Sequence, residues 1–87
     1  MRNFEETITK NGKEFTLYID KHNNCIMIYE DYWTICYPKQ FNGEWCFYID
    51  NKDFVESVFN LKLYRINFIH ESAEKFYNII NNQSVAV

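Results

Sequence analysis

The amino-acid sequence predicts an α+β domain: an antiparallel, meander-like sheet of four to five strands, followed by two helices that pack on one face. Three observations lead to this prediction. Apolar residues alternate with period two through the first half of the chain. Asn-Gly pairs, a strong signal for short hairpins, stand at residues 11–12 and 42–43. After Asp50 the apolar spacing changes to three and four residues, as on one face of a helix.

The predicted strands follow one another through short turns. A weak strand at residues 4–9 precedes Asn11-Gly12, because both residues tolerate the positive φ of a type I′ turn. The second strand, residues 14–20, alternates cleanly. Residues 22–24 predict the next turn, and Cys25–Tyr29 the third strand.

The second half of the meander is built in the same way. Residues 30–31 predict a bulge or tight turn before a fourth strand at residues 32–37. Pro38 is expected to stop that strand, because proline cannot donate to a ladder. Residues 44–49 form the fifth strand, after the second Asn-Gly turn.

Alternation along these strands assigns their residues to two faces of the sheet. The predicted core face is Phe15, Leu17, Ile19, Ile26, Ile28, Trp33, Ile35, Trp45, Phe47 and Ile49. The reverse face is Tyr18, Met27, Tyr29, Tyr32 and Tyr48, with Cys25, Cys36 and Cys46. This reverse face is too apolar for a solvated surface, so either another element or a partner covers it. A one-residue slip in register would exchange the faces.

Two helices follow the sheet. Asp50 is the predicted N-cap of a short helix that ends near Asn60. Its apolar residues form the i,i+4 pairs Phe54/Val58 and Val55/Phe59. Residues 63–69 fit either a strand or a continued helix. An apolar stripe predicts a second, amphipathic helix over residues 70–82, and residues 83–87 are expected to fray.

Size and charge limit the function. The 87 residues predict one domain, residues 1–87, and the net charge is −3. This acidic balance argues against direct binding to duplex nucleic acid, because such affinity comes largely from Lys and Arg. No apolar run reaches the roughly 18–20 residues that span a bilayer, and the first residues lack a signal-peptide hydrophobic region. We therefore expect no membrane contact and a cytoplasmic location, the host cytoplasm if a phage encodes the chain.

The composition also reflects codon usage. Residue types with AT-rich codons fill 45 of the 87 positions: Phe, Tyr, Met, Ile, Asn and Lys. Types with GC-rich codons fill only 7: Gly, Ala, Arg and Pro. This imbalance indicates an AT-rich genome, such as that of a low-GC bacterium, its phages or plasmids, or an AT-rich eukaryote.

Cysteine and histidine offer the first candidate chemistry. His22 and Cys25 have the spacing of a zinc knuckle, and Cys36, Cys46 and His70 could complete a site. Cys36 and Cys46 fall inside predicted strands, however, where free cysteine usually acts as a small buried hydrophobe. A nucleophilic Cys25 activated by His22 is the corresponding enzymatic alternative. We expect no cofactor and no metal.

Carboxylates and aromatic residues offer the other candidates. The carboxylates are scattered, as in turns, caps and a solvated surface, although Glu30-Asp31 could form an acidic patch for a basic partner. A sheet of aromatic residues can stack single-stranded bases. The pattern of basic, glycine and aromatic residues found in such platforms is absent, and the charge is unfavourable.

In size, acidity, AT-rich coding and lack of a catalytic set, the chain resembles small proteins of phages and mobile elements that bind and block a larger host protein. Inhibitors of defence nucleases, including anti-CRISPR proteins, belong to this class. The leading hypothesis is therefore a non-enzymatic protein-binding inhibitor or regulator, whose partner is a larger host protein that could be part of a nucleoprotein complex. The alternatives are a self-associating homodimer and, less favoured, a small Cys-dependent or metal-binding enzyme. The predicted partner-binding residues are Tyr29, Glu30, Asp31, Tyr32, Tyr18 and Tyr48.

Overall fold

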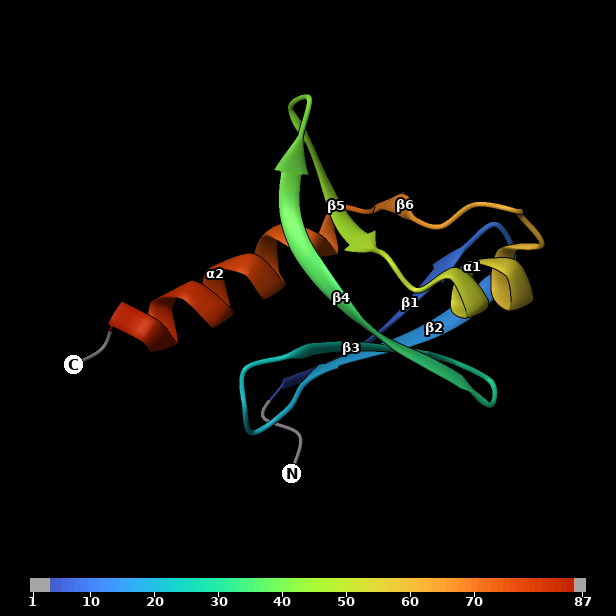
Figure 1. Ribbon diagram of the computed structural model, residues 1–87. Helices are drawn as coiled ribbons and strands as arrows, with labels where there is room; N and C mark the ends of the chain where they lie inside the picture. Colours follow the sequence, from blue (N-terminus) through green and yellow to red (C-terminus); the bar gives the residue numbers. More distant parts are fainter. Residues whose placement is uncertain (1–3, 86–87) are drawn as a thin grey trace.

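The computed structural model describes residues 4–85, and only the backbone of residues 83–85. It has the α+β class that the sequence predicts, with a curled antiparallel sheet and two helices (Figure 1). The elements in chain order are β1 (Phe4–Lys10), β2 (Lys13–Ile19), β3 (Cys25–Tyr29), β4 (Tyr32–Phe41), β5 (Glu44–Ile49), α1 (Lys52–Phe59), β6 (Ile66–Ile69) and α2 (Ser72–Val85).

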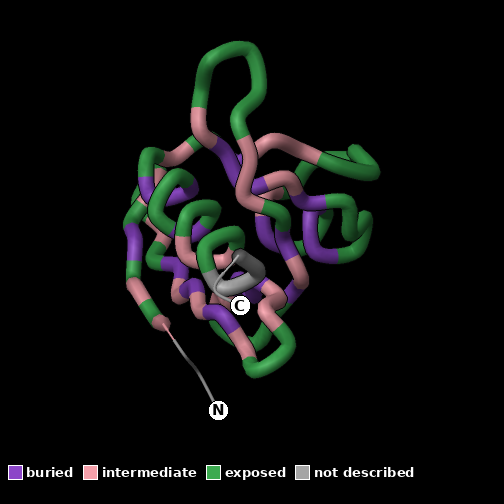
Figure 2. Tube along the Cα trace, turned by 90° about the vertical axis from the view of Figure 1, so that its left-hand side faces the viewer, coloured by how far each residue is buried: buried purple, intermediate pink, exposed green. Residues whose placement is uncertain are grey.

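The sheet has six strands, more than the four to five predicted, and they neighbour one another in chain order. The additional strand is β6, which decides that the ambiguous residues 63–69 end in a strand beside β5. The long strand β4 joins the two halves of the curled sheet. Its first half pairs with β3 and its second half with β5. The β4–β5 hairpin projects from the body with an exposed tip (Figures 1 and 2).

Both helices contribute to one core on the inner face of the curled sheet. Helix α2 supplies Phe76, whose ring lies 5.6 Å from that of Phe47 on β5. The ring centroids of Phe15 on β2 and Phe68 on β6 are 5.0 Å apart, so the two halves of the sheet are in contact across the interior. Fully buried aromatic rings therefore supply much of the core that a small chain needs.

Side chains link the two edges of the sheet. The Lys10 ammonium on β1 donates to the carbonyl oxygen of Ile69 on β6. Glu6 on β1 accepts a hydrogen bond from Ser72 Oγ and pairs with Lys75 Nζ, each at 2.7 Å. The hydrogen bonds from Lys75 and Ser72 lower the pKa of Glu6. The open edge of β1 is therefore tied to β6 and α2.

Local chemistry explains several element boundaries. Both residues of Asn11-Gly12 have positive φ, as do both residues of Asn42-Gly43, which confirms the two hairpin turns. Helix α1 is capped by Asn51 and not by Asp50, because the Asn51 side chain accepts the Phe54 N–H at 3.1 Å. It ends at Asn60 in the left-handed conformation, as predicted near that residue.

Helix α2 begins at Ser72, two residues later than predicted. His70 Nδ1 accepts the Ser72 backbone N–H at 3.0 Å, which satisfies one of the unpaired donors of the first turn. The helical backbone continues to Val85. The predicted fraying of residues 83–87 stays a prediction, and residues 86–87 lie outside the described part of the chain.

The predicted faces of β3 and β4 are inverted. Leu17 pairs with Met27 and Cys25 pairs with Cys36, so these residues share the inner face. The prediction of a reverse-face position is therefore wrong for Met27, Tyr29, Tyr32, Cys25 and Cys36. The residues wrongly assigned to the core lie instead on the outer face: Ile26, Ile28, Trp33 and Ile35.

The first cause of this inversion is the β2–β3 loop. Asp20 leaves the strand because its Oδ1 accepts the backbone N–H groups of His22 and Asn24, each at 2.9 Å. The loop therefore spans residues 20–24 and pairs Ile19 with Cys25. A strand that kept Asp20 would have paired Ile19 with Ile26 instead.

The second cause is Pro38, which does not stop β4 as predicted. The strand continues to Phe41, and its pairing with β3 ends at Cys36. Pro38 is therefore paired on the β5 side only, an edge position that proline tolerates. Because β4 is unbroken, the two-residue turn places Tyr37 opposite Tyr48 on the outer face.

Candidate protein-binding surface

The outer face of β4 carries a row of large apolar side chains, Trp33, Ile35 and Tyr37, called here the outer row. Alternation along an extended strand turns all three to the same side. Trp33 is 63% exposed and Tyr37 is 48% exposed. Both described helices contribute to the core on the opposite, inner face, so the outer row remains accessible.

Neighbouring strands extend the outer row. Tyr48 on β5 lies opposite Tyr37, with ring centroids 6.2 Å apart. The Lys39 ammonium stands 4.5 Å from the centre of the Tyr48 ring, a cation–π contact. On the other side, Ile28 of β3 lies opposite Trp33. This apolar surface thus crosses three paired strands, with its aromatic side chains on β4 and β5.

Acidic side chains border this surface. Asp50 lines the same shallow hollow as Trp33 and Tyr37, on the side where β4 has no pairing with β5. Glu44 shares the outer face with Phe41, its partner across the β4–β5 hairpin. Glu30 and Asp31 form the turn at the other end of the row, and both are exposed.

The predicted partner-binding residues separate into two groups. Tyr29, Glu30, Asp31 and Tyr32 lie together at the β3–β4 turn. Tyr18 and Tyr48 lie on the outer face, where both are partly buried. Trp33 connects the groups, since it follows the turn directly and begins the outer row.

The two tyrosines of the turn differ in environment. The Tyr29 ring packs on that of Phe15 at 5.2 Å and so belongs partly to the core. Desolvation, together with the charge and hydrogen bond of Glu30, raises the pKa of Tyr29. Tyr32 is 44% exposed and remains a candidate contact.

Glu30 adopts a left-handed backbone conformation, with φ of 53°. Among the described non-glycine residues, the others with positive φ are all asparagines: Asn11, Asn23, Asn42 and Asn60. Asparagine adopts this conformation more readily than glutamate, for which it is strained. Backbone strain of this kind concentrates at functional sites, so the turn is a candidate contact region.

Sequence reasoning missed Trp33 and Tyr37 as surface residues because it placed Trp33 in the core and ended β4 before Pro38. The signal that could have found them is the two-residue Asn42-Gly43 turn. Counted back from this turn through an unbroken strand, Tyr37 falls opposite Tyr48. Sequence reasoning also missed the exposed loop between α1 and β6. In this loop Tyr64 is 73% exposed, and the Lys52 ammonium lies 5.3 Å from the centre of its ring.

The candidate zinc residues are not brought together. His70 caps α2, Cys36 faces the core, and Cys46 lies on the outer face, where its thiol is 3.7 Å from Asn67 Oδ1. Within residues 4–85 there is no group of three or more His, Cys, Asp or Glu side chains that could hold a metal ion.

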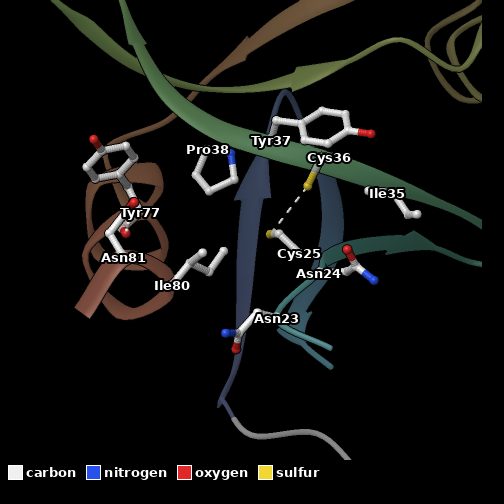
Figure 3. Close-up of a pocket in the computed structure, with 10 residues that line it drawn as sticks. All are labelled: Asn23, Asn24, Cys25, Ile35, Cys36, Tyr37, Pro38, Tyr77, Ile80 and Asn81. Atoms are coloured by element: carbon white, nitrogen blue, oxygen red, sulfur yellow. Dashed lines mark hydrogen bonds between the residues drawn. The ribbon is translucent and has the colours of Figure 1, made fainter. Parts of the chain in front are cut away.

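A pocket of about 190 Å³ lies between the start of β3, the middle of β4 and α2 (Figure 3). Its lining includes the Cys25 and Cys36 thiols, together with Tyr77 and Ile80 of α2. The titratable residues of its lining are therefore two cysteines and two tyrosines, Tyr37 and Tyr77, and the two sulfur atoms are its distinctive chemistry.

Comparisons with known proteins leave the geometry as the basis for any functional argument. No family model, no curated protein and no solved structure matches the chain. No helix in the described residues has both the length and the apolar character needed to cross a membrane.

Proposed function

We propose that the chain is a non-enzymatic protein-binding module, which inhibits or regulates a larger protein by occupying its functional surface. The contact surface consists of the outer row and the β3–β4 turn. The observation that supports it best is the exposure of Trp33 and Tyr37, which lie on the same face of one paired strand with Ile35 between them. Large exposed aromatic groups of this kind are common anchors at protein interfaces.

The scaffold favours such a role. Trp33 and Ile35 lie on the half of β4 that pairs with β3, and Tyr37 on the half that pairs with β5. Anchors on a paired strand are already ordered, so binding loses less conformational entropy than it would with anchors on a free loop.

The acidic border suggests the chemistry of the partner. Asp31, Glu44 and Asp50 surround aromatic residues in a chain of net charge −3. Such a surface complements a basic one, and the nucleic-acid-binding surface of a protein is basic. We therefore propose a nuclease or another nucleic-acid-binding host protein as the target, as for phage-encoded anti-defence and anti-CRISPR inhibitors. Direct binding to duplex nucleic acid forms no part of the proposal.

Site-specific photo-crosslinking tests this proposal. A photoreactive phenylalanine is placed at Trp33 or Tyr37, with Tyr64 as the control position, because Tyr64 is also an exposed aromatic residue but lies in the α1–β6 loop. The proteins are exposed to lysates of a low-GC bacterium, with and without phage infection, and adducts are identified by mass spectrometry.

The proposal expects one nucleic-acid-binding protein to be crosslinked from positions 33 and 37 and not from position 64. Wild-type chain should then inhibit the purified target, whereas the Trp33→Ala/Tyr37→Ala double variant should lose most of that inhibition. Crosslinks only between copies of the chain would replace this proposal with the homodimer. Equal adducts from all three positions would remove the outer row as the contact surface.

A further inference from the structure

Cys25 and Cys36 form a contacting pair of buried thiols. They lie directly opposite one another on β3 and β4, on the inner face of the sheet. The Cys36 thiol donates to Cys25 Sγ at 3.4 Å (Figure 3). Neither is in a disulfide, and their exposures are 2% and 1%.

The backbone geometry of this pair suits a disulfide bond. Opposite residues of an antiparallel ladder have Cα atoms about 4.5–5.5 Å apart, inside the range of about 4.4–6.8 Å that disulfides span. The two sulfur atoms must approach by only about 1.4 Å to reach bonding distance. No large movement of β3 or β4 is required.

We propose that Cys25 and Cys36 are a thiol–disulfide exchange site that a small disulfide, such as oxidised glutathione, converts to an internal cross-strand bond. One cysteine loses its proton and attacks a sulfur of the reagent, which gives a mixed disulfide and releases one thiol. The second cysteine then loses its proton, attacks the protein sulfur and releases the second thiol. In total the protein loses two electrons and two protons, and the reagent gains them and becomes two thiols.

The pocket beside the pair provides the approach. Its volume of about 190 Å³ is well above the roughly 10–15 Å³ that a cavity needs to hold one water molecule. Both cysteines line it, as does Ile80 of α2. Burial, together with the neighbouring Cys25 thiol, raises the pKa of the Cys36 thiol, so exchange should be slow at neutral pH and faster as the pH rises.

The third cysteine is a built-in control. Cys46 is buried on the outer face of β5, opposite Ile69, whereas Cys25 and Cys36 lie on the inner face. The sheet therefore separates Cys46 from the pair, and it should remain a free thiol while the other two react.

The experiment treats folded wild-type protein with oxidised glutathione at neutral and mildly alkaline pH. Free thiols are then alkylated in denaturant and the intact mass is measured. The expected product has lost two hydrogen atoms and accepts one alkyl group, where the reduced protein accepts three. Because Glu30 and Asp31 lie between the two cysteines, cleavage after Glu30 should leave two peptides held together by the bond until dithiothreitol is added.

Variants make the result specific. Cys46→Ser should still form the internal bond, whereas Cys25→Ala and Cys36→Ala should each stop at a glutathione adduct or not react. Three alkylatable thiols in the treated wild-type protein, at both pH values, would overturn the proposal. A bond that includes Cys46, or a stable glutathione adduct on wild-type Cys25 or Cys36, would overturn it as well.

Discussion

Replacing Glu30 with glycine should stabilise the fold and weaken partner binding at the same time. Glu30 occupies the left-handed region at the β3–β4 turn, with φ of 53°. At the other described left-handed positions the chain has asparagine or glycine. If a contact with the partner requires Glu30, the benefit of a carboxylate beside Tyr29 and Asp31 outweighs the cost of the strained backbone.

The size of the stabilisation follows from the backbone. A non-glycine residue in the left-handed region costs roughly 1–2 kcal/mol, and glycine loses roughly 0.5–1 kcal/mol more chain entropy on folding than alanine. The net gain for Glu30→Gly is therefore about 0.5–1 kcal/mol. For a domain of this size each kcal/mol moves Tm by about 4–8 °C, so the expected rise is about 2–8 °C.

Thermal unfolding followed by circular dichroism measures this rise, and capture of the crosslinked target measures binding. Glu30→Asn should also raise Tm, because asparagine tolerates the conformation but lacks the carboxylate. Asp31→Gly is the matched control: Asp31 is not among the positive-φ residues, so glycine there should lower Tm slightly. A lower Tm in Glu30→Gly would refute the strain argument, and unchanged capture by both Glu30 variants would remove Glu30 from the contact surface.

Three further predictions test the core, the edge bridge and the thiol pair. Phe15→Ala should cost about 3–5 kcal/mol in chemical denaturation, because the ring is fully buried against other aromatic rings; a loss below about 1 kcal/mol would contradict the packing. The hydrogen bonds from Lys75 and Ser72 lower the pKa of Glu6 below its ordinary 4.5, so this carboxylate stabilises the fold above that pH and the contribution is lost as the pH falls through the lowered pKa. Glu6→Gln should accordingly flatten the acid limb of a Tm-against-pH curve, and an unchanged limb would exclude this role. Oxidation of Cys25 and Cys36 should stabilise the fold by up to about 3 kcal/mol, from the loop-closure entropy of residues 25–36; an oxidised protein that melts at or below the reduced Tm would contradict this gain.

Much of the fold could be predicted because its signals are local. The Asn-Gly turns need residues that accept positive φ, and the chain supplies them at the predicted places. The short helix before Asn60 follows from i,i+4 apolar pairs and a left-handed cap. Strand β6 could not be predicted with the same ease, because its four residues are stabilised by pairing with β5, which is a tertiary contact.

The faces of β3 and β4 could not be predicted because they depend on the number of residues in two connections. One residue more or fewer in either connection exchanges the two faces of the strand that follows. Asp20 belongs to the β2–β3 loop and not to β2 because its carboxylate accepts hydrogen bonds from the His22 and Asn24 N–H groups. Pro38 is acceptable within β4 only because β3 no longer pairs there. Each event shifts the expected register by one residue. Together they invert β3 and β4 while leaving β2 and β5 as predicted.

The same two events create both proposed sites. They turn Trp33, Ile35 and Tyr37 outward, away from the helices, and they bring Cys25 and Cys36 inward beside α2. If β3 and β4 had the predicted register, the outer row would be buried and the thiols of Cys25 and Cys36 would be exposed. The register of β3 and β4 therefore determines both the outward position of the outer row and the inward position of the thiol pair. Evidence that Cys25 and Cys36 join in an internal bond would support the inward position of that pair and, through the alternation of β4, the outward position of the row.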